Sequence, residues 1–258
     1  MSATEAGPDP DPQPDLQPVS VPARERPRLV ALLEVLLCSG FPTQQAIGQT
    51  LAVAGYSPFG GDGRLRTGPF VVLAITDTVV LITLIALLLH AHGERLRDVV
   101  FGTRRWPAES RLGVLLVPAL FVGVGVTVLL TRTLLPWTHN VSLSPFEGLL
   151  RRPVDIVWFG VVVVVAGGIR EEVQRAFLLH RFEASLGGPT VGLVVVSFFF
   201  GLFHASQGWD AAIATGLLGL TWGWLFLRRR SAIAPMVSHA GYDIAQILQA
   251  VAVQSLRV

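Results

Sequence analysis

Three places in the C-terminal half of the sequence combine acidic, basic and imidazole side chains with long apolar runs. They are Arg170-Glu171-Glu172-Val173-Gln174-Arg175, Phe200-Gly201-Leu202-Phe203-His204 and His239-Ala240-Gly241-Tyr242-Asp243. Each contains two residues four positions apart, namely Glu171 and Arg175, Phe200 and His204, and His239 and Asp243. On a helix this spacing places both side chains on one face, one turn apart. Three helices can therefore direct two carboxylates and two imidazoles into one buried volume.

These side chains are sufficient to activate water. A glutamate can take a proton from water, while two imidazoles either hold a metal ion or donate hydrogen bonds to a developing oxyanion. Each motif also has a structural interpretation: Glu171 with Arg175 as a neutralised ion pair, His204 as a hydrogen-bonded interior histidine, and His239 with Asp243 as an intrahelical hydrogen bond. The occurrence of all three motifs in consecutive segments favours a functional site.

Other polar residues of the apolar segments lie outside any recognisable motif. We interpret Glu34 and Asp77 as packing or helix-pairing residues. The single cysteine, Cys38, is predicted to be a packing residue, and it excludes both a disulfide framework and a cysteine-based zinc site. The sixth apolar segment contains three tryptophans that are predicted to anchor it at the membrane interface, namely Trp209, Trp222 and Trp224.

The composition indicates that these motifs lie in a membrane. Of the 258 residues, 51% are hydrophobic and only 15% are charged, and the mean hydropathy is +0.56. An ordinary soluble domain has about 25% charged residues. The net charge is only +2, and all 20 basic residues are arginines in short clusters, so the sequence has no nucleic-acid-binding face. We therefore predict an all-α fold, a polytopic transmembrane helical bundle with a central polar cavity.

Seven apolar segments predict about seven membrane helices. They cover approximately residues 29–55, 69–90, 112–135, 154–179, 189–206, 209–227 and 231–253. Gly40, Phe41 and Pro42 interrupt the first segment, and they are expected either to kink the helix or to end it and restart it.

The chain divides into a tail, residues 1–27, and a transmembrane domain, residues 28–258. The tail contains seven prolines and few large apolar residues, so we predict a disordered extension and not a cleavable signal peptide. Arginines are concentrated in the tail, in the loop after the second segment and in the loop after the sixth. This bias predicts a multi-pass protein of the cell membrane with a cytoplasmic N-terminus. The absence of lysine suggests a GC-rich genome and therefore a bacterial cytoplasmic membrane.

Together the three motifs resemble the family of CAAX proteases and bacteriocin-processing enzymes, also called the Abi family, which includes the Ras-converting CAAX endopeptidase. The family pattern is a Glu-Glu pair with an arginine four residues past its second glutamate, then Phe-x-x-x-His, then His-x-x-x-Asn or Asp. The second and third motifs match as written, and the stretch from Ala234 to His239 also resembles family members. The resemblance covers about residues 154–250, the predicted catalytic core.

The first motif departs from this pattern by one residue, because Arg175 lies only three residues beyond Glu172. If the two glutamates are aligned with the family, Glu171 is the water-activating residue and Ala176 occupies the arginine position. If Arg175 is aligned, Glu171 is the second glutamate and Arg170 occupies the first position. Glu171 is matched in both registers.

The resemblance implies a helical bundle with an internal cavity, open towards the membrane and an aqueous side, in which peptide bonds are hydrolysed. The implied roles are water activation for Glu171 or Glu172, orientation of the carboxylates for Arg175, metal binding or stabilisation of the tetrahedral intermediate for His204 and His239, and support of His239 or the oxyanion for Asp243. Zinc or another divalent metal is the expected cofactor, if there is one, with Glu171, His204 and His239 as ligands. The His-Glu-x-x-His spacing typical of zinc peptidases is absent.

The leading hypothesis is an intramembrane endopeptidase of the CAAX-protease type that uses glutamate-activated water, with metal assistance left open. Its expected partners are a membrane-associated peptide or protein substrate and the lipid bilayer, without nucleic acid. A catalytically silent membrane scaffold or chaperone of the same fold is an alternative, which the altered first motif supports. A proton-coupled transporter is a third hypothesis, because buried carboxylates and histidines also mark ion pathways, but no internal repeat is found in the sequence.

Overall fold

The computed structural model describes residues 27–61, 64–142, 145–150 and 152–256. Within these ranges the chain is helical apart from its connections and one isolated bridge between Phe59 and Leu65, which confirms the all-α prediction. The predicted disordered tail lies outside the described residues except for Pro27. The helices in chain order are α1 (Arg28–Leu37), α2 (Phe41–Val53), α3 (Thr67–Ala91), η1 (Arg97–Phe101), α4 (Trp106–Leu134), η2 (Pro136–Thr138), η3 (Pro145–Leu150), α5 (Pro153–Val162), η4 (Val163–Glu171), α6 (Glu172–Ser185), α7 (Pro189–Leu202), η5 (Ala205–Gln207), α8 (Trp209–Arg229) and α9 (Ile233–Ser255).

Six helical segments of the described residues are long and apolar enough to cross a membrane. They are α1 with α2, α3, α4, α5 through α6, α7 with η5, and α8. The seventh predicted segment is also a helix, the 23-residue α9. Polar side chains such as His239, Asp243 and Gln246 lower the mean hydropathy of α9. It is therefore long enough to cross a membrane but less apolar than the other six segments.

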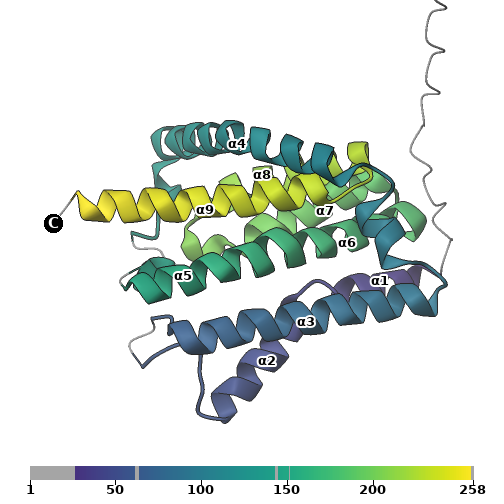
Figure 1. Cartoon of the computed structure of the whole chain (residues 1–258), viewed down its shortest axis with the longest axis horizontal. Coiled ribbons are helices and arrows are strands. Elements are labelled where there is room, and N and C mark those ends of the chain that lie inside the picture. Colours follow the sequence, from purple (N-terminus) through teal and green to yellow (C-terminus); the bar gives the residue numbers. More distant parts are fainter. Residues whose placement is uncertain (1–26, 62–63, 143–144, 151, 257–258) are drawn as a thin grey trace, which may run out of the picture.

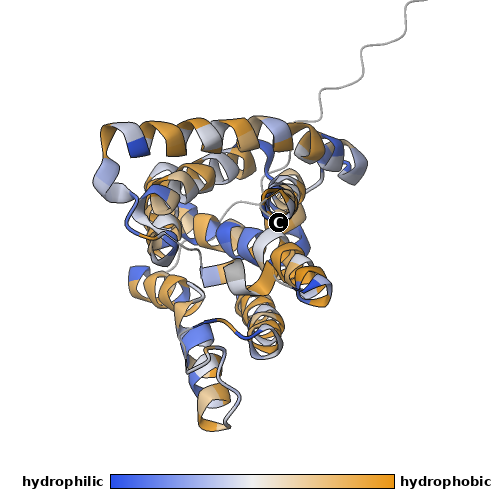
Figure 2. Ribbon diagram, turned by 90° about the vertical axis from the view of Figure 1, so that its left-hand side faces the viewer, coloured by the Kyte–Doolittle hydropathy of each residue, from blue (hydrophilic) through white to orange (hydrophobic). Residues whose placement is uncertain are grey.

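Apolar side chains cover the outside of the bundle. Figure 2 shows hydrophobic residues along most of the length of the outer helices. In the most apolar 18-residue stretch of α4, only 6% of the residues are buried inside the protein. Leu115, Leu129 and Leu134 are each more than 60% exposed. A soluble monomer rarely exposes apolar surface of this extent, because water does not favour it. These faces are therefore suited to contact with lipid tails, and the chain is a multi-pass membrane protein.

The first motif lies at the centre of the bundle. Helices α5 and α6 run in line, with α3 on one side of them and α9 on the other (Figure 1). The π-helical segment η4 joins α5 to α6 and packs against both α3 and α9. Segments of π-helix are rare and are frequently found at functional sites. The segment ends at Glu171, so the unusual backbone leads directly into the Glu-Glu pair.

The predicted interruption of the first apolar segment ends one helix and starts another. Gly40 adopts a φ of +83°, a left-handed conformation that glycine tolerates without the steric cost of a Cβ atom. Pro42 then lies in the first turn of α2, where its missing N–H group has no helical partner to lose. The neighbouring Cys38 is fully buried in the main apolar cluster, as predicted for a packing residue.

A buried ionic network joins the N-terminal helices to α6. The Arg181 side chain has no exposed surface, and its Nε and Nη1 atoms donate to Glu34 and Glu94 over 2.5 and 2.8 Å. His92 contacts the other oxygen of Glu34 at 2.6 Å, and His180 contacts the other oxygen of Glu94 at 2.9 Å. The pairing confirms the interpretation of Glu34 as a helix-pairing residue.

Arg181→Gln should lower the free energy of unfolding by about 3–5 kcal/mol, because it leaves two buried carboxylates without their shared guanidinium. The matched control is Arg111→Gln on the exposed surface of α4, which should change it by less than about 0.5 kcal/mol. Denaturant unfolding in detergent, followed by circular dichroism, measures both. Equal effects of the two substitutions would contradict a structural role for the network.

Candidate active site

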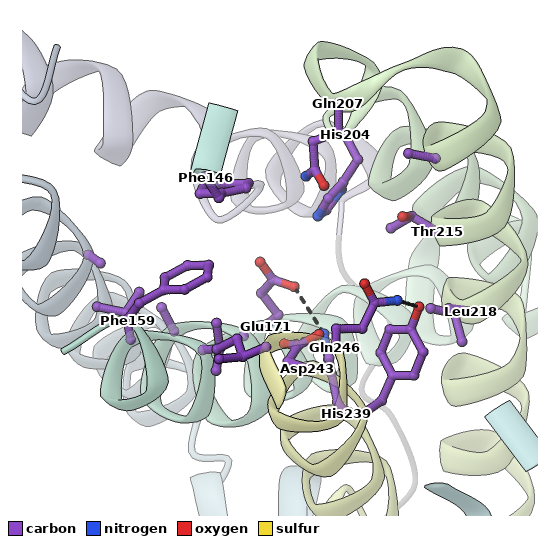
Figure 3. Close-up of a pocket in the computed structure, with 18 of the residues that line it drawn as sticks. Phe146, Phe159, Glu171, His204, Gln207, Thr215, Leu218, His239, Asp243 and Gln246 are labelled. Atoms are coloured by element: carbon purple, nitrogen blue, oxygen red, sulfur yellow. Dashed lines mark hydrogen bonds and ion pairs between the residues drawn. The ribbon is translucent and has the colours of Figure 1, made fainter. Parts of the chain in front are cut away.

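The motif residues meet at a cavity of about 620 Å³ inside the bundle. Glu171, His204, His239 and Asp243 all line it. Figure 3 shows Glu171, His239 and Asp243 on one side, His204 with Gln207 on the opposite side, and Phe146 and Phe159 towards one end. The predicted central cavity is therefore present, with these polar side chains set in a largely apolar wall. Its dimensions are those of pockets that accommodate small ligands or a few residues of a peptide.

The two adjacent glutamates occupy different environments. The Glu171 side chain lines the cavity and is 22% exposed. Glu172 is only 1% exposed and lies behind His239, outside the cavity lining. Because a general base must reach the water or substrate from which it takes a proton, the geometry favours Glu171 over Glu172 for that task.

Glu172 fixes the orientation of His239. The His239 Nδ1 atom lies 2.8 Å from Glu172 Oε1, and an ionised carboxylate can only accept, so Nδ1 donates. Arg175 donates to the same carboxylate oxygen. A partner on one ring nitrogen determines the tautomer and the direction of the other nitrogen. The His239 Nε2 atom is thereby directed towards Glu171 and Asp243.

The structural interpretation of Glu171 and Arg175 as a neutralised ion pair is wrong. Arg175 pairs with Glu172, three residues before it, since neighbours three and four apart both share a helix face. Its guanidinium also lies over two aromatic rings, 4.5 Å from the centre of Phe200 and 5.6 Å from that of Trp222. These cation–π contacts hold the Arg175 guanidinium between the Glu172 carboxylate and the two rings.

The pair of His239 and Asp243 is present as the spacing predicts. Asp243 Oδ2 lies 3.6 Å from His239 Nε2, and Glu171 Oε2 lies 3.8 Å from the same nitrogen. Both distances are within the range of an ion pair but longer than a hydrogen bond. Two carboxylates from different helices thus flank one imidazole nitrogen at the wall of the cavity.

His204 reaches the cavity from the end of α7. Its Nδ1 atom lies 2.7 Å from the Phe200 carbonyl oxygen, which can only accept a hydrogen bond, so Nδ1 carries a proton. The ring also packs on Phe200, with 4.9 Å between ring centres. Phe200 thus fixes His204 through its backbone and its side chain, which gives the four-residue spacing of this motif a physical reason.

Trp222 contributes to the site, contrary to its prediction as an interfacial anchor. It is 1% exposed, whereas Trp209 and Trp224 are 41% and 52% exposed. Its ring stacks on His239 with 3.8 Å between ring centres and 18° between planes, and its Nε1 donates to Ser238 Oγ. Residue spacing within one helix could not predict this contact, because it joins residues of two helices, α8 and α9.

Glycines bring η4 and α9 into backbone contact beside the motifs. A Cβ atom on Gly168 would lie 2.6 Å from the Cβ of Ala240 and 3.1 Å from the Met236 carbonyl oxygen. A Cβ atom on Gly167 would lie 2.7 Å from Asp243 Oδ2. The two distances below 3.0 Å are shorter than real Cβ atoms show, so a side chain at either glycine would force its neighbour to move. The close contact is what brings Glu171 near His239.

The predicted metal ligands do not come together as a metal site. Among the side chains that the structure describes, no three from His, Cys, Asp and Glu form a group that could hold a metal ion. His204 lies across the cavity from Glu171 and His239 (Figure 3). The prediction of zinc or another divalent metal at these three residues thus gains no support from the arrangement.

The fold and site define a helical membrane protein with carboxylates and imidazoles around one internal cavity. Residues 153–245 match the family model of the type II CAAX prenyl endopeptidases, described as Rce1-like. This match supports membership of the CAAX protease family for the part of the chain that holds the three motifs. No curated protein and no solved structure matches the chain significantly. The matched residues contain all three motifs, whereas helices α1 to α4 lie outside the match.

Gly168→Ala should lower the free energy of unfolding by about 1–3 kcal/mol, because the added methyl group forces η4 and α9 apart. Gly123→Ala is the matched control in α4, where a new Cβ atom meets nothing within 4 Å. Because alanine loses less conformational freedom than glycine when a helix forms, the control variant should be more stable by about 0.5–1 kcal/mol. Denaturant unfolding in detergent compares the two, and a Gly168→Ala variant as stable as the control would contradict the close contact.

Proposed function

We propose that the protein is an intramembrane endopeptidase that hydrolyses a peptide bond of a membrane-associated protein or peptide, with Glu171 as the general base. The observation that carries this proposal is the separation of the two glutamates. Glu171 faces the cavity, and Glu172 is buried behind His239 with Arg175 as its partner. The match of residues 153–245 to the family model supports the class of reaction.

The proposed reaction begins with water held by Glu171. Glu171 takes a proton as the water oxygen bonds to the scissile carbonyl carbon, and the carbonyl oxygen becomes an oxyanion. When the C–N bond breaks, the carboxylic acid of Glu171 returns that proton to the leaving amine. Water is thereby divided between the new carboxyl and amino termini, and the glutamate is regenerated.

The two histidines are suited to the oxyanion. His239 donates through Nδ1 to Glu172, so its Nε2 can donate towards the cavity when the ring carries its second proton. His204 has the equivalent arrangement, with Nδ1 held by the Phe200 carbonyl. Preorganised donors directed at a developing negative charge are worth about 10²–10³ in rate each. Asp243 would stabilise the protonated ring of His239 from the cavity side.

We further propose an orientation with the arginine-rich loops in the cytoplasm of a bacterial cell. The α3–α4 and α8–α9 connections lie side by side, since Arg104 Nε donates to the Arg229 carbonyl over 2.7 Å and Ala232 N donates to the Val100 carbonyl over 2.8 Å. Two of the three arginine-rich segments therefore share one end of the bundle, and α9 ends at the opposite end (Figure 1). The positive-inside rule supports a cytoplasmic location for this end.

Glu171→Gln should abolish peptide cleavage while leaving folding intact, because the amide cannot take a proton from water. His204→Ala should lower kcat by about 10²–10³. The measurement uses purified protein with two quenched fluorescent probes: a peptide ending in a farnesylated CAAX sequence, and a library of unmodified peptides. Cleavage of one probe alone identifies the substrate class.

Glu109→Gln is the control, since Glu109 is 1% exposed and paired with Arg229 but does not line the cavity. It should retain full activity. Metal content and chelator sensitivity of the same samples test metal assistance directly. Cleavage that persists at the wild-type rate in Glu171→Gln would refute the proposed base. Failure of the folded wild type to cleave either probe would favour the scaffold, and proton-coupled uptake in proteoliposomes would favour the transporter.

A further inference from the structure

A second buried ion pair lies at the wall of the same cavity. Asp77 of α3 is 1% exposed, and its Oδ2 atom lies 2.7 Å from Arg170 Nη2. Thr43 Oγ1 donates to the other Asp77 oxygen over 2.5 Å, and Gln44 Nε2 approaches Oδ2 at 3.4 Å. Asp77, Arg170 and Gln44 all line the cavity. This confirms Asp77 as a helix-pairing residue and also brings it to the candidate site.

Arg170 has two carboxylates within reach. Its Nη2 atom is bound to Asp77, and its Nη1 atom lies 3.9 Å from Glu171 Oε1. Nη1 also donates to Gln174 Oε1 over 3.2 Å, and Gln174 is held in turn by the Cys38 carbonyl. The buried Nε atom has no hydrogen-bond partner among the described residues. The guanidinium therefore retains an unused donor, in a residue that directly precedes the proposed base.

We infer that Asp77 is a positioning residue that keeps the Arg170 guanidinium beyond hydrogen-bonding distance of Glu171, so that the Glu171 oxygens stay free to accept from water. This inference rests on the proposed function. Arginine and carboxylate groups form strong bidentate pairs where water is scarce. Without Asp77, the carboxylate that remains within 4 Å of Arg170 among the described residues is that of Glu171. A direct pair between them would occupy the oxygens that must accept the proton of water.

The inference gives the N-terminal helices a part in the reaction. Asp77, Thr43 and Gln44 belong to α2 and α3, outside residues 153–245 that match the family model. Arg170 lies inside the match, directly before Glu171. The contact between α3 and η4 is thus more than a packing contact, because it determines which carboxylate the arginine neutralises.

Asp77→Asn tests this role, because it removes the charge and retains the shape of the side chain. We expect kcat to fall about ten- to a hundredfold, a part of the roughly 10²–10⁴ that a general base contributes, with KM changed less than about threefold. The double substitution Asp77→Asn/Arg170→Gln removes both charges, so no guanidinium remains to pair with Glu171. Its kcat should recover to within about threefold of the wild type.

If the ion pair only linked α3 to η4, the double variant would also lack that link. Its kcat would then stay as low as that of Asp77→Asn. The matched control is Glu34→Gln, which removes one carboxylate of another buried pair between an N-terminal helix and an arginine of the matched region. It should keep the wild-type kcat. A comparable loss in the control would attribute the effect to loosened N-terminal helices.

The outcomes separate this inference from the proposed function. Wild-type cleavage that Glu171→Gln abolishes and Asp77→Asn leaves unchanged would overturn the role of Asp77 alone. A double variant no more active than Asp77→Asn would do the same. Absence of wild-type cleavage, or full activity of Glu171→Gln, would overturn both. Denaturant unfolding of each variant in detergent verifies that the comparison concerns folded protein.

Discussion

Every charge buried in this bundle must find its counterpart inside the protein, because the surrounding lipid offers none. The central arginines obey this constraint through specific carboxylates: Arg181 with Glu34 and Glu94, Arg175 with Glu172, and Arg170 with Asp77. The consequence is visible at Glu171. Among the described residues, no guanidinium lies at hydrogen-bonding distance from it, and its carboxylate faces the cavity. Pairing elsewhere is thus what leaves one carboxylate available for chemistry.

The same pairs position the helices that form the site. Asp77 joins α3 to η4 on one side of the first motif, and Glu172 joins α6 to His239 of α9 on the other. The glycines of η4 shorten the distance to α9 further. Buried ion pairs are often no more stabilising than well-packed apolar residues of similar volume. Their value lies in the specificity of the arrangement.

Periodicity and spacing were sufficient to predict the all-α membrane fold and to select Glu171, His204, His239 and Asp243, since all four residues line one cavity. Periodicity and spacing could not show which of Glu171 and Glu172 faces the cavity. The two side chains point in different directions from the helix, and the arrangement of the neighbouring helices decides which direction leads to the cavity. The four-residue spacing also offered Glu171 as an ion-pair partner of Arg175, whereas the arginine pairs with Glu172 and lies against the rings of Phe200 and Trp222 on other helices. Trp222 and Asp77 act across helices distant in sequence, where a local pattern carries no information.

The central claim is that Glu171 acts on a peptide bond inside this cavity. A cryo-electron microscopy structure of the Glu171→Gln variant with whichever peptide the wild type cleaves would test it most directly, since the variant should hold the substrate without cutting it. The account predicts the scissile carbonyl carbon beside the side chain at position 171, with the carbonyl oxygen directed at His204 or His239. A peptide bound outside the cavity, or with its scissile bond beside another carboxylate, would contradict it.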